Sequence, residues 1–178
     1  KTGEIVALLG ANGAGKSTLL KALCGDVKLQ AGEIFLENRL LRDWHYHRLA
    51  RKRAILLQHS NLNFPFTARE VALLGRNPHI RGSESAKDLE IVERALELVE
   101  AAHLAGQQFP TLSGGERQRV HLARILAQIW EKPRAGARYL LLDEPTASLD
   151  LAHQHLTLET ARRFAELDTA VLVILHDL

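Results

Sequence analysis

The stretch GANGAGKST, at residues 10–18, constrains this chain more than any other part of it. It follows the apolar run IVALL at 5–9 and places three glycines, one lysine and two hydroxyl groups within nine residues. Glycine weakens the interior of a helix or strand, so these residues do not favour a packed core. An apolar strand, a glycine-rich loop and a helix in this order instead predict a loop whose backbone N–H groups converge on an anion.

The loop matches G-x-x-x-x-G-K-[ST], the pattern of phosphate-binding loops, in the strand–loop–helix context that the pattern requires. We expect Lys16 to place a point charge between the β- and γ-phosphates and Ser17 to offer its hydroxyl to Mg²⁺. The helix that begins near Lys16 points its positive dipole end at the same anion. The loop residues expected to surround the phosphates are Gly10, Asn12, Gly13, Ala14 and Gly15.

Short apolar runs alternate with helical patterns along the chain and predict an α/β fold. The runs expected to form strands are 5–9, 33–36, 54–57, 139–142 and 170–175. Unbroken runs predict strands buried on both faces of a mostly parallel sheet, whereas the alternating EIFL at 33–36 predicts a small antiparallel edge sheet. The expected helices are 16–24, closed by Gly25, then 86–102 and 150–167. The apolar stripe expected on the helix at 86–102 consists of Leu89, Val92, Leu96 and Val99. The stripe expected on the helix at 150–167 consists of Leu151, Leu158, Ala161 and Ala165.

The middle of the chain has a different character from its ends. Residues 67–128 carry helical patterns without a strand, and strands precede and follow them. We therefore expect one domain over 1–178, with a helical subdomain at about 67–128 inserted into the α/β core. The chain opens with Lys1 and contains no methionine, so we interpret it as an excerpt from a longer protein.

Composition narrows the function classes. A net charge of +2 without a long basic run does not indicate nucleic acid as a partner. No apolar segment approaches the roughly 18 residues that span a bilayer, and no signal-peptide pattern is present. The single cysteine, Cys24, allows no intramolecular disulfide.

The segment YLLLDEP, at 139–145, is an apolar strand that ends in two carboxylates. A carboxylate at the tip of a buried strand is costly unless it faces a cation or hydrogen-bond donors. Asp143 is therefore expected to hold Mg²⁺ and Glu144 to act as the general base that activates the attacking water. The alternative, that both residues only open a turn before Pro145, loses weight beside the phosphate loop.

Two more polar residues follow apolar runs at the same expected edge of the sheet. His176 comes directly after the run at 170–175 and is expected to contact the γ-phosphate and the water held by Glu144. Gln58 follows the run at 54–57, and its amide is expected to reach Mg²⁺ or the water. Each of them alone would more often be a structural residue at a strand end.

LSGGERQRV, at 112–120, contains a second candidate anion site. Ser113 followed by Glu116 forms a capping box, which predicts a helix that starts near Gly114, and Gly115 lets an anion approach the free N–H groups. The chain thus carries two candidate phosphate sites but one pair of carboxylates. The economical solution is a symmetric dimer in which this segment faces the phosphate loop of the other copy.

Together, these motifs resemble the ATP-binding cassette family: GANGAGKST, Gln58, LSGGE, YLLLDEP, the ASLD at 147–150 and His176, in that order. The resemblance covers essentially the whole chain, and LSGGE separates this family from other phosphate-loop proteins. ASLD stands where the family more often has SALD. The family's adenine-stacking aromatic residue lies upstream of Lys1, so base recognition is not visible here.

The resemblance implies a P-loop NTPase fold and a head-to-tail homodimer that sandwiches two ATP molecules with Mg²⁺. It assigns Lys16, Ser17 and Thr18 to the phosphates and Mg²⁺ and makes His176 the partner of Glu144. It assigns Ser113, Gly114, Gly115 and Glu116 to the opposite nucleotide. It also assigns Asp150 to communication across the dimer.

A closer resemblance is to the ATPase subunits of bacterial importers for haem, iron-siderophores and cobalamin. The pattern FPFT–EV–GR–PH within 58–79 carries it, and the insertion WEKPRAGAR at 130–138 is most like the haem importers. This implies a dimeric membrane permease docked against residues from Gln58 to about Asn77. It also implies a periplasmic substrate-binding protein as an indirect partner and a peripheral location on the cytoplasmic face of the inner membrane.

Several alternatives stay open at this point. The cargo could be an iron-siderophore or cobalamin instead of haem. A soluble cassette ATPase of translation carries two cassettes in one chain, which this sequence does not exclude. Chromosome-type members insert long coiled coils before LSGGE, whereas Gln58 and Ser113 here lie only 55 positions apart. A P-loop kinase has no need of LSGGE.

Overall fold

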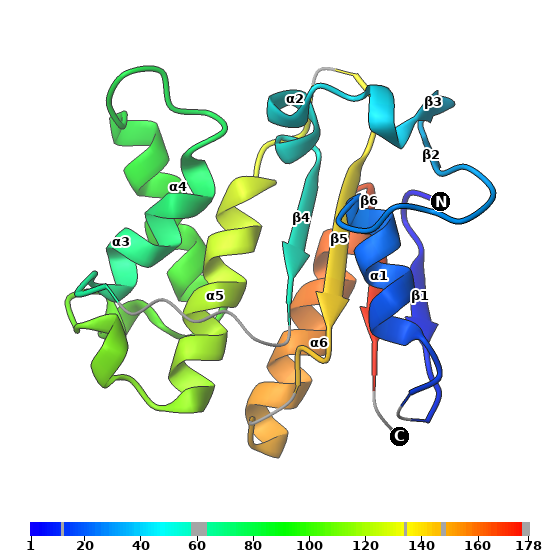
Figure 1. The fold of residues 1–178 in the computed structure, drawn as a ribbon. Coiled ribbons are helices and arrows are strands. Elements are labelled where there is room, and N and C mark those ends of the chain that lie inside the picture. Colours follow the sequence, from blue (N-terminus) through cyan, green and yellow to red (C-terminus); the bar gives the residue numbers. More distant parts are fainter. Residues whose placement is uncertain (12, 58–63, 134, 147–148, 176–178) are drawn as a thin grey trace.

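The computed structural model describes residues 1–11, 13–57, 64–133, 135–146 and 149–175, and its centre is a four-stranded parallel sheet (Figure 1). The strands lie in the order β1 (Ile5–Leu8), β6 (Thr169–Ile174), β5 (Arg138–Asp143) and β4 (Arg53–Leu56). Because the strands are parallel, their carboxyl ends meet at one edge of the sheet, the lower edge in Figure 1. The predicted mostly parallel α/β sheet is confirmed.

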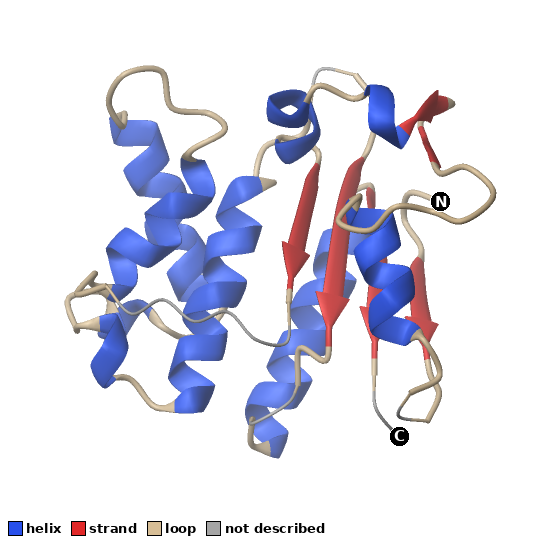
Figure 2. Cartoon of the chain, in the orientation of Figure 1, coloured by secondary structure: helices blue, strands red, loops and turns tan. Residues whose placement is uncertain are grey.

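Helices cover both faces of this sheet, which explains why its strands are unbroken apolar runs. Figure 2 shows α1 (Lys16–Cys24) in front of the sheet and α6 (Leu151–Glu166) behind it. The edge strand β1 departs from the prediction of burial on both faces, because Ile5 and Val6 are 43% and 52% exposed. Most residues of the inner strands β5 and β6 are buried, as the fully covered Leu140 of β5 shows.

A second, two-stranded sheet follows α1. The strands β2 (Phe35–Leu36) and β3 (Arg39–Leu40) are antiparallel, as EIFL predicts, although only two residues of that run are in the strand. Glu37 and Asn38 make the two-residue turn with φ values of 52° and 60°, as a tight hairpin requires. The chain returns to the main sheet through a 3-10 turn, η1 (Leu41–Asp43), and a short helix, α2 (Tyr46–Ala50).

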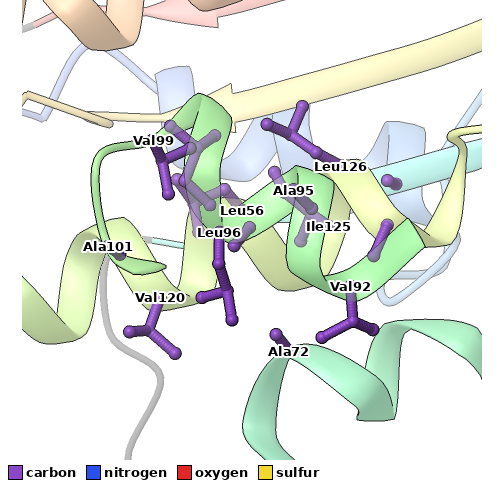
Figure 3. Packing of buried hydrophobic residues seen from close by; sticks show 14 of the residues in the cluster. Leu56, Ala72, Val92, Ala95, Leu96, Val99, Ala101, Val120, Ile125 and Leu126 are labelled. Atoms are coloured by element: carbon purple, nitrogen blue, oxygen red, sulfur yellow. The ribbon is translucent and has the colours of Figure 1, made fainter. Parts of the chain in front are cut away.

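Beside β4 lies a group of three helices joined by 3-10 turns, on the left in Figure 1. The helices are α3 (Ala68–Leu73), α4 (Ala86–Leu98) and α5 (Gly114–Gln128), and the turns are η2 (Leu74–Arg76), η3 (Ala102–Leu104) and η4 (Phe109–Thr111). Figure 3 shows Leu56 of β4 beside the side chains of α4 and α5. One apolar core thus continues from the helices into the sheet, and a separate helical subdomain at about 67–128 stays a prediction.

Two of the expected apolar stripes are wrong in part. Leu89 of α4 is exposed, and the buried face of that helix instead includes Ile91 and Ala95. On α6, Leu151 is 82% exposed and Leu158 also faces solvent, while the residues that pack are Thr157, Thr160, Ala161, Phe164 and Ala165. The other expected residues, Val92, Leu96, Val99, Ala161 and Ala165, are buried as predicted. Only the three leucines were misplaced, because Ile91 and Ala95 on α4, and Thr157, Thr160 and Phe164 on α6, fill the buried positions instead.

Candidate functional site

The glycine-rich loop leaves β1 at the carboxyl edge of the sheet and runs directly into α1. Gly13 and Gly15 have φ values of 81° and 89°, in the left-handed region that residues with a side chain rarely adopt. Gly10 is different, because its φ is ordinary and an added Cβ would make only ordinary contacts, with the Cβ of Ala14 at 3.6 Å and the Cδ of Lys16 at 4.0 Å. The backbone path of this loop therefore depends on glycine at 13 and 15.

The lysine of the loop is buried against it. Lys16 is 8% exposed, and its ammonium group donates hydrogen bonds to the carbonyl oxygens of Gly10 and Ala11, the second at 3.2 Å. These bonds hold the start of the loop against the first turn of α1. Ser17 and Thr18 follow on the same turn and are exposed, so their hydroxyl groups are accessible to a ligand.

The first turn of α1 also lacks the side-chain cap that the other long helices have. Its N-cap is Gly15, which offers no side-chain acceptor. Side chains that accept a hydrogen bond from the helix start cap α3, α4, α5 and α6; they are Thr67, Ser85, Ser113 and Asp150. Since the first N–H groups of a helix have no partner within it, those of α1 are suited to bind an anion, and the helix dipole favours the same charge.

Two carboxylates lie at the end of β5, at the same edge of the sheet. Asp143, the last residue of the strand, is 6% exposed. Glu144 has a φ of 46°, and its N–H donates to the carbonyl oxygen of Ile174 on β6 at 3.0 Å. Leu175 in turn donates to Leu8 at 3.1 Å. These bonds attach the turn that carries both carboxylates to the end of β6, and the end of β6 to the end of β1, where the phosphate loop begins.

The helix start predicted for LSGGE is confirmed. Ser113 is the N-cap of α5 and accepts from the N–H of Glu116 at 3.3 Å, while a Glu116 carboxylate oxygen accepts from the N–H of Ser113 at 2.8 Å. These bonds lower the pKa of the Glu116 carboxyl below its ordinary value. Ser113 and Gly114 are exposed, so the turn presents its backbone to the solvent.

Within one chain the structure does not bring this turn to the phosphate loop. In Figure 1, α5 begins at the lower left and α1 begins at the lower right, with β4, β5 and β6 between them. Within one chain, the phosphate loop and the LSGGE turn therefore lie on opposite sides of Asp143 and Glu144. This separation matches the expectation that a second copy completes each site.

One residue of this region was absent from the sequence prediction. Gln118, one helical turn after Gly114 on α5, donates through its side-chain amide to the carbonyl oxygen of Pro145 at 3.4 Å. It thus links the helix of the LSGGE segment to the turn that carries Asp143 and Glu144. Its spacing of four from Gly114 is the signal that could have placed it on the same helical face.

Of the remaining residues expected at the site, only some lie in the described part of the chain. Asn12, Gln58 and His176 lie outside the described residues. Asp150 is the N-cap of α6 and accepts from the backbone N–H of His153 at 2.9 Å and from its Nδ1 at 2.7 Å, and these bonds lower the pKa of its carboxyl.

The residues expected to bind Mg²⁺ suit that ion chemically. Ser17 supplies a hydroxyl oxygen and Asp143 a buried carboxylate, which are ligands that Mg²⁺ accepts. In the part of the chain that the structure describes, no group of three or more His, Cys, Asp or Glu side chains could form a metal site. Protein groups of this number fit an ion that is bound mainly through nucleotide phosphates and water.

A parallel sheet in which a glycine-rich loop joins the first strand to a helix, and in which β5, separated from that strand by β6, leads into Asp-Glu, defines the class of P-loop α/β domains. Within this class, residues 1–147 match the family model of the ABC transporter. The chain belongs to the ABC transporter family.

Curated relatives with high identity carry one common description. The chain is 54% identical over 176 residues to the hemin import ATP-binding protein HmuV of Gloeobacter violaceus and, over the same length, to that of Myxococcus xanthus. These matches cover 99% of the chain but only 64% and 66% of the two relatives. Identity to the Pseudomonas entomophila protein of the same description is 53%, over 100% of the chain and 68% of the relative. The chain thus spans just under two thirds of the first two relatives.

Solved structures share the fold. A dimeric ATP-binding cassette in a post-hydrolysis state bound to ADP and Pi superposes with a TM-score of 0.83 at 30% identity, covering 99% of this chain and 76% of that one. An inward-facing ABC transporter assigned to the metal-chelate type gives 0.77 at 30% identity, covering 99% and 64%. The P-loop architecture predicted from the sequence is therefore confirmed.

Proposed function

We propose that this chain is the nucleotide-binding part of an ATP-hydrolysing subunit of a bacterial importer, and that the cargo is hemin. The observation that carries the proposal is the separation of the phosphate loop and the LSGGE turn across one sheet edge, because a partner copy in head-to-tail orientation would bring the two together. The relatives described as hemin import ATP-binding proteins support the cargo.

In this mechanism the N-terminal N–H groups of α1 and the loop 10–18 bind the ATP phosphates. Lys16 exchanges its carbonyl partners for phosphate oxygens, since a phosphate is the stronger partner for an ammonium group. Ser17, Asp143 and Gln58 would hold Mg²⁺, whose charge would offset part of the negative charge of the phosphates. Ser113, Gly114, Gly115 and Glu116 of the second copy complete the site.

Hydrolysis then follows from the position of Glu144. Its carboxylate accepts a proton from a water molecule, whose oxygen forms a bond to the γ-phosphorus while the bond to the β–γ bridging oxygen breaks. His176 orients the water and the γ-phosphate, and Asp150 connects the two sites. ADP and phosphate then leave. The homodimer opens because the γ-phosphate, which both copies contacted, is no longer part of the bound nucleotide.

The importer role assigns the remaining partners. A dimeric permease docks near α3, the periplasmic substrate-binding protein acts through the permease, and the subunit is peripheral on the cytoplasmic face of the inner membrane. The described helices include none that is long and apolar enough to cross a membrane. An iron-siderophore or cobalamin is the second candidate cargo, favoured by the similarity to the metal-chelate type transporter.

The test uses the complete protein with its permease in vesicles. We expect ATPase activity that hemin, delivered by the periplasmic binding protein, stimulates and that accompanies hemin uptake. Glu144→Gln should lower ATP hydrolysis by at least about 100-fold and retain ATP binding, because the amide accepts no proton. Stimulation by a siderophore or cobalamin, but not by hemin, would replace the cargo, and brisk turnover by the variant would remove Glu144 as the base.

A further inference from the structure

Arg76 is the most deeply buried arginine described in the chain, at 2% exposed, and it joins three elements. It ends η2, directly after α3. Its Nε donates to Asp88 Oδ1 at 2.9 Å in the first turn of α4, and its Nη1 donates to the carbonyl oxygen of Ala127 at 2.8 Å in the last turn of α5. Its Nη2 donates to Glu131 Oε2 at 2.7 Å, just beyond α5. Each nitrogen of the guanidinium group therefore donates a hydrogen bond.

The charges around Arg76 are balanced. Asp88 and Glu131 supply two carboxylates, and Lys87 pairs with the second of them. Burial raises the pKa of the Asp88 carboxyl, but the hydrogen bonds from Ser85 and Arg76 outweigh burial and bring the pKa down to about 2. The carboxylate is therefore ionised over the physiological range, and the cluster keeps its charges.

Stability alone is a weak reason to bury such a cluster. The desolvation of buried ions can cancel their attraction, and apolar replacements of similar volume are often as stable. What apolar side chains cannot supply is a fixed geometry of three directed bonds from a planar group. The arrangement therefore indicates that the relative position of the three elements is what Arg76 provides.

Contacts of the residues next to Arg76 involve the C-terminal half of α5. Gly75 packs so closely on α5 that an added Cβ would lie 2.0 Å from the carbonyl oxygen of Arg124. A ring nitrogen of His79 lies 2.8 Å from the carbonyl oxygen of Gln128, the last residue of α5. The Gln128 amide donates to Ala50 at 2.7 Å and to Arg53, the first residue of β4, at 3.0 Å. The end of α5 is thus bound to the segment after α3 and to the sheet.

The opposite end of α5 carries the LSGGE turn. The helix has 15 residues, so the turn lies about 20 Å from the Arg76 cluster at 1.5 Å per residue. Between α3 and α4 the chain passes through the three-residue 3-10 turn η2 and then through residues 77–85, which belong to no helix or strand. The hydrogen bonds of Arg76 therefore add directed links to the apolar packing that already joins α3 to α5.

We propose that Arg76 is a positioning residue that fixes α3 and α4 to α5 as one rigid unit, so that a displacement of α3 by the permease reaches the LSGGE turn. This inference rests on the proposed function. The insertion at 130–138 takes part through Glu131, so the segment that is most like the haem importers also completes the cluster.

Arg76→Lys in the complete protein, assembled with its permease in vesicles, is the test. Lysine keeps the charge but presents its donors from a single nitrogen, so it cannot reproduce the three bonds that the separate guanidinium nitrogens make. We expect basal ATPase activity and ATP affinity within about two-fold of the wild type, while stimulation by cargo and cargo transported per ATP each fall at least about five-fold. The matched control is Arg162→Lys on α6, an exposed arginine that also pairs with two carboxylates, Glu159 and Glu166, and it should behave as the wild type.

A purely structural role gives a different result. It lowers thermal stability and basal activity together and leaves the stimulation ratio unchanged, which would overturn the proposal, as would an equal loss in the control. If the lysine variant does not fold, Glu131→Gln decides by the same ratio, because Glu131 is partly exposed and Asp88 still holds Arg76. A wild type without transport activity instead contradicts the proposed function and is recognised before any variant is compared.

Discussion

Lys16 illustrates how one side chain connects the stability of a loop to ligand binding. Its ammonium group is buried and satisfied by carbonyl oxygens of its own loop, so the loop keeps its shape through contacts within 10–16. The same group can bind a phosphate after a small movement because Gly13 and Gly15 keep side chains out of the loop.

We expect Lys16→Ala in the complete protein to raise the dissociation constant of ATP at least about ten-fold, because a charge-assisted hydrogen bond of roughly 1.5–3 kcal/mol is lost. Titration calorimetry with ATP measures this. Lys21→Ala, exposed in the last turn of the same helix, is the control and should bind as the wild type. Unchanged affinity in Lys16→Ala would contradict the assignment of the loop.

Asp88 gives the chain an acid sensitivity with a defined direction. Its pKa in the folded protein is about 2 against an ordinary value of 3.8, so its carboxylate stabilises the fold above about pH 4. This contribution is lost as the pH falls from about 4 to about 2. We expect the free energy of unfolding of Asp88→Asn to fall less over this interval, by roughly 1–2 kcal/mol, in urea titrations at several pH values. The exposed Asp26→Asn should follow the wild type, and parallel curves for all three proteins would contradict the prediction.

At the scale of elements, the local patterns predicted the strands well and the helix ends and faces less well. The helix expected at 86–102 ends at Leu98, where Glu100 takes a φ of 53° and a 3-10 turn begins at Ala102. Val99 follows Leu96 at three positions and Ala102 follows Val99 at three, so the helical spacing continues through this break and periodicity alone cannot show it. The pairing order β1-β6-β5-β4 depends on contacts between distant segments, which local patterns do not contain.

The close contact between η2 and α5 makes a prediction about stability. Gly75→Ala should lower the free energy of unfolding by roughly 2–4 kcal/mol, because the added Cβ meets the backbone of Arg124, which cannot move without distorting α5. Thermal or urea unfolding of the complete protein measures this. Gly106→Ala, where an added Cβ meets no atom within 4 Å, should change stability by less than about 0.5 kcal/mol. Equal stability of the two variants would show that the helices can separate freely.

At the scale of the whole molecule, the sequence predicted the parts of the site and the structure shows how they are separated. Motif spacing placed Lys16, Asp143, Glu144 and Ser113 at strand ends and helix starts, which the fold confirms. The link from Gln118 to Pro145 could not be predicted because it depends on how α5 packs beside the sheet. The positions of Gln58 and His176 at the site stay predictions.

The separation of the two anion sites also allows a substitution that leaves the single chain intact and blocks the dimer. Gly114 is the first residue of α5, is exposed, and an added Cβ there meets no atom within 4 Å. A carboxylate at this position is favourable for the helix by roughly 0.3–1 kcal/mol, because it faces the positive end of the helix dipole. Across the proposed interface the same carboxylate faces the γ-phosphate of the other copy. We therefore expect Gly114→Glu, in a complete protein that also carries Glu144→Gln, to bind ATP normally but to remain monomeric.

Size-exclusion chromatography with light scattering, with and without ATP, measures the outcome. Glu144→Gln alone should dimerise with ATP, and adding Gly106→Glu, at an equally open and exposed position outside residues 112–116, should leave that dimer unchanged. Since Gly114→Glu retains its fold, its failure to dimerise would isolate the contact between one copy's LSGGE turn and the other copy's nucleotide. A dimer that forms equally well with Gly114→Glu must use another surface, and each phosphate loop would then have to work without amides from a second copy.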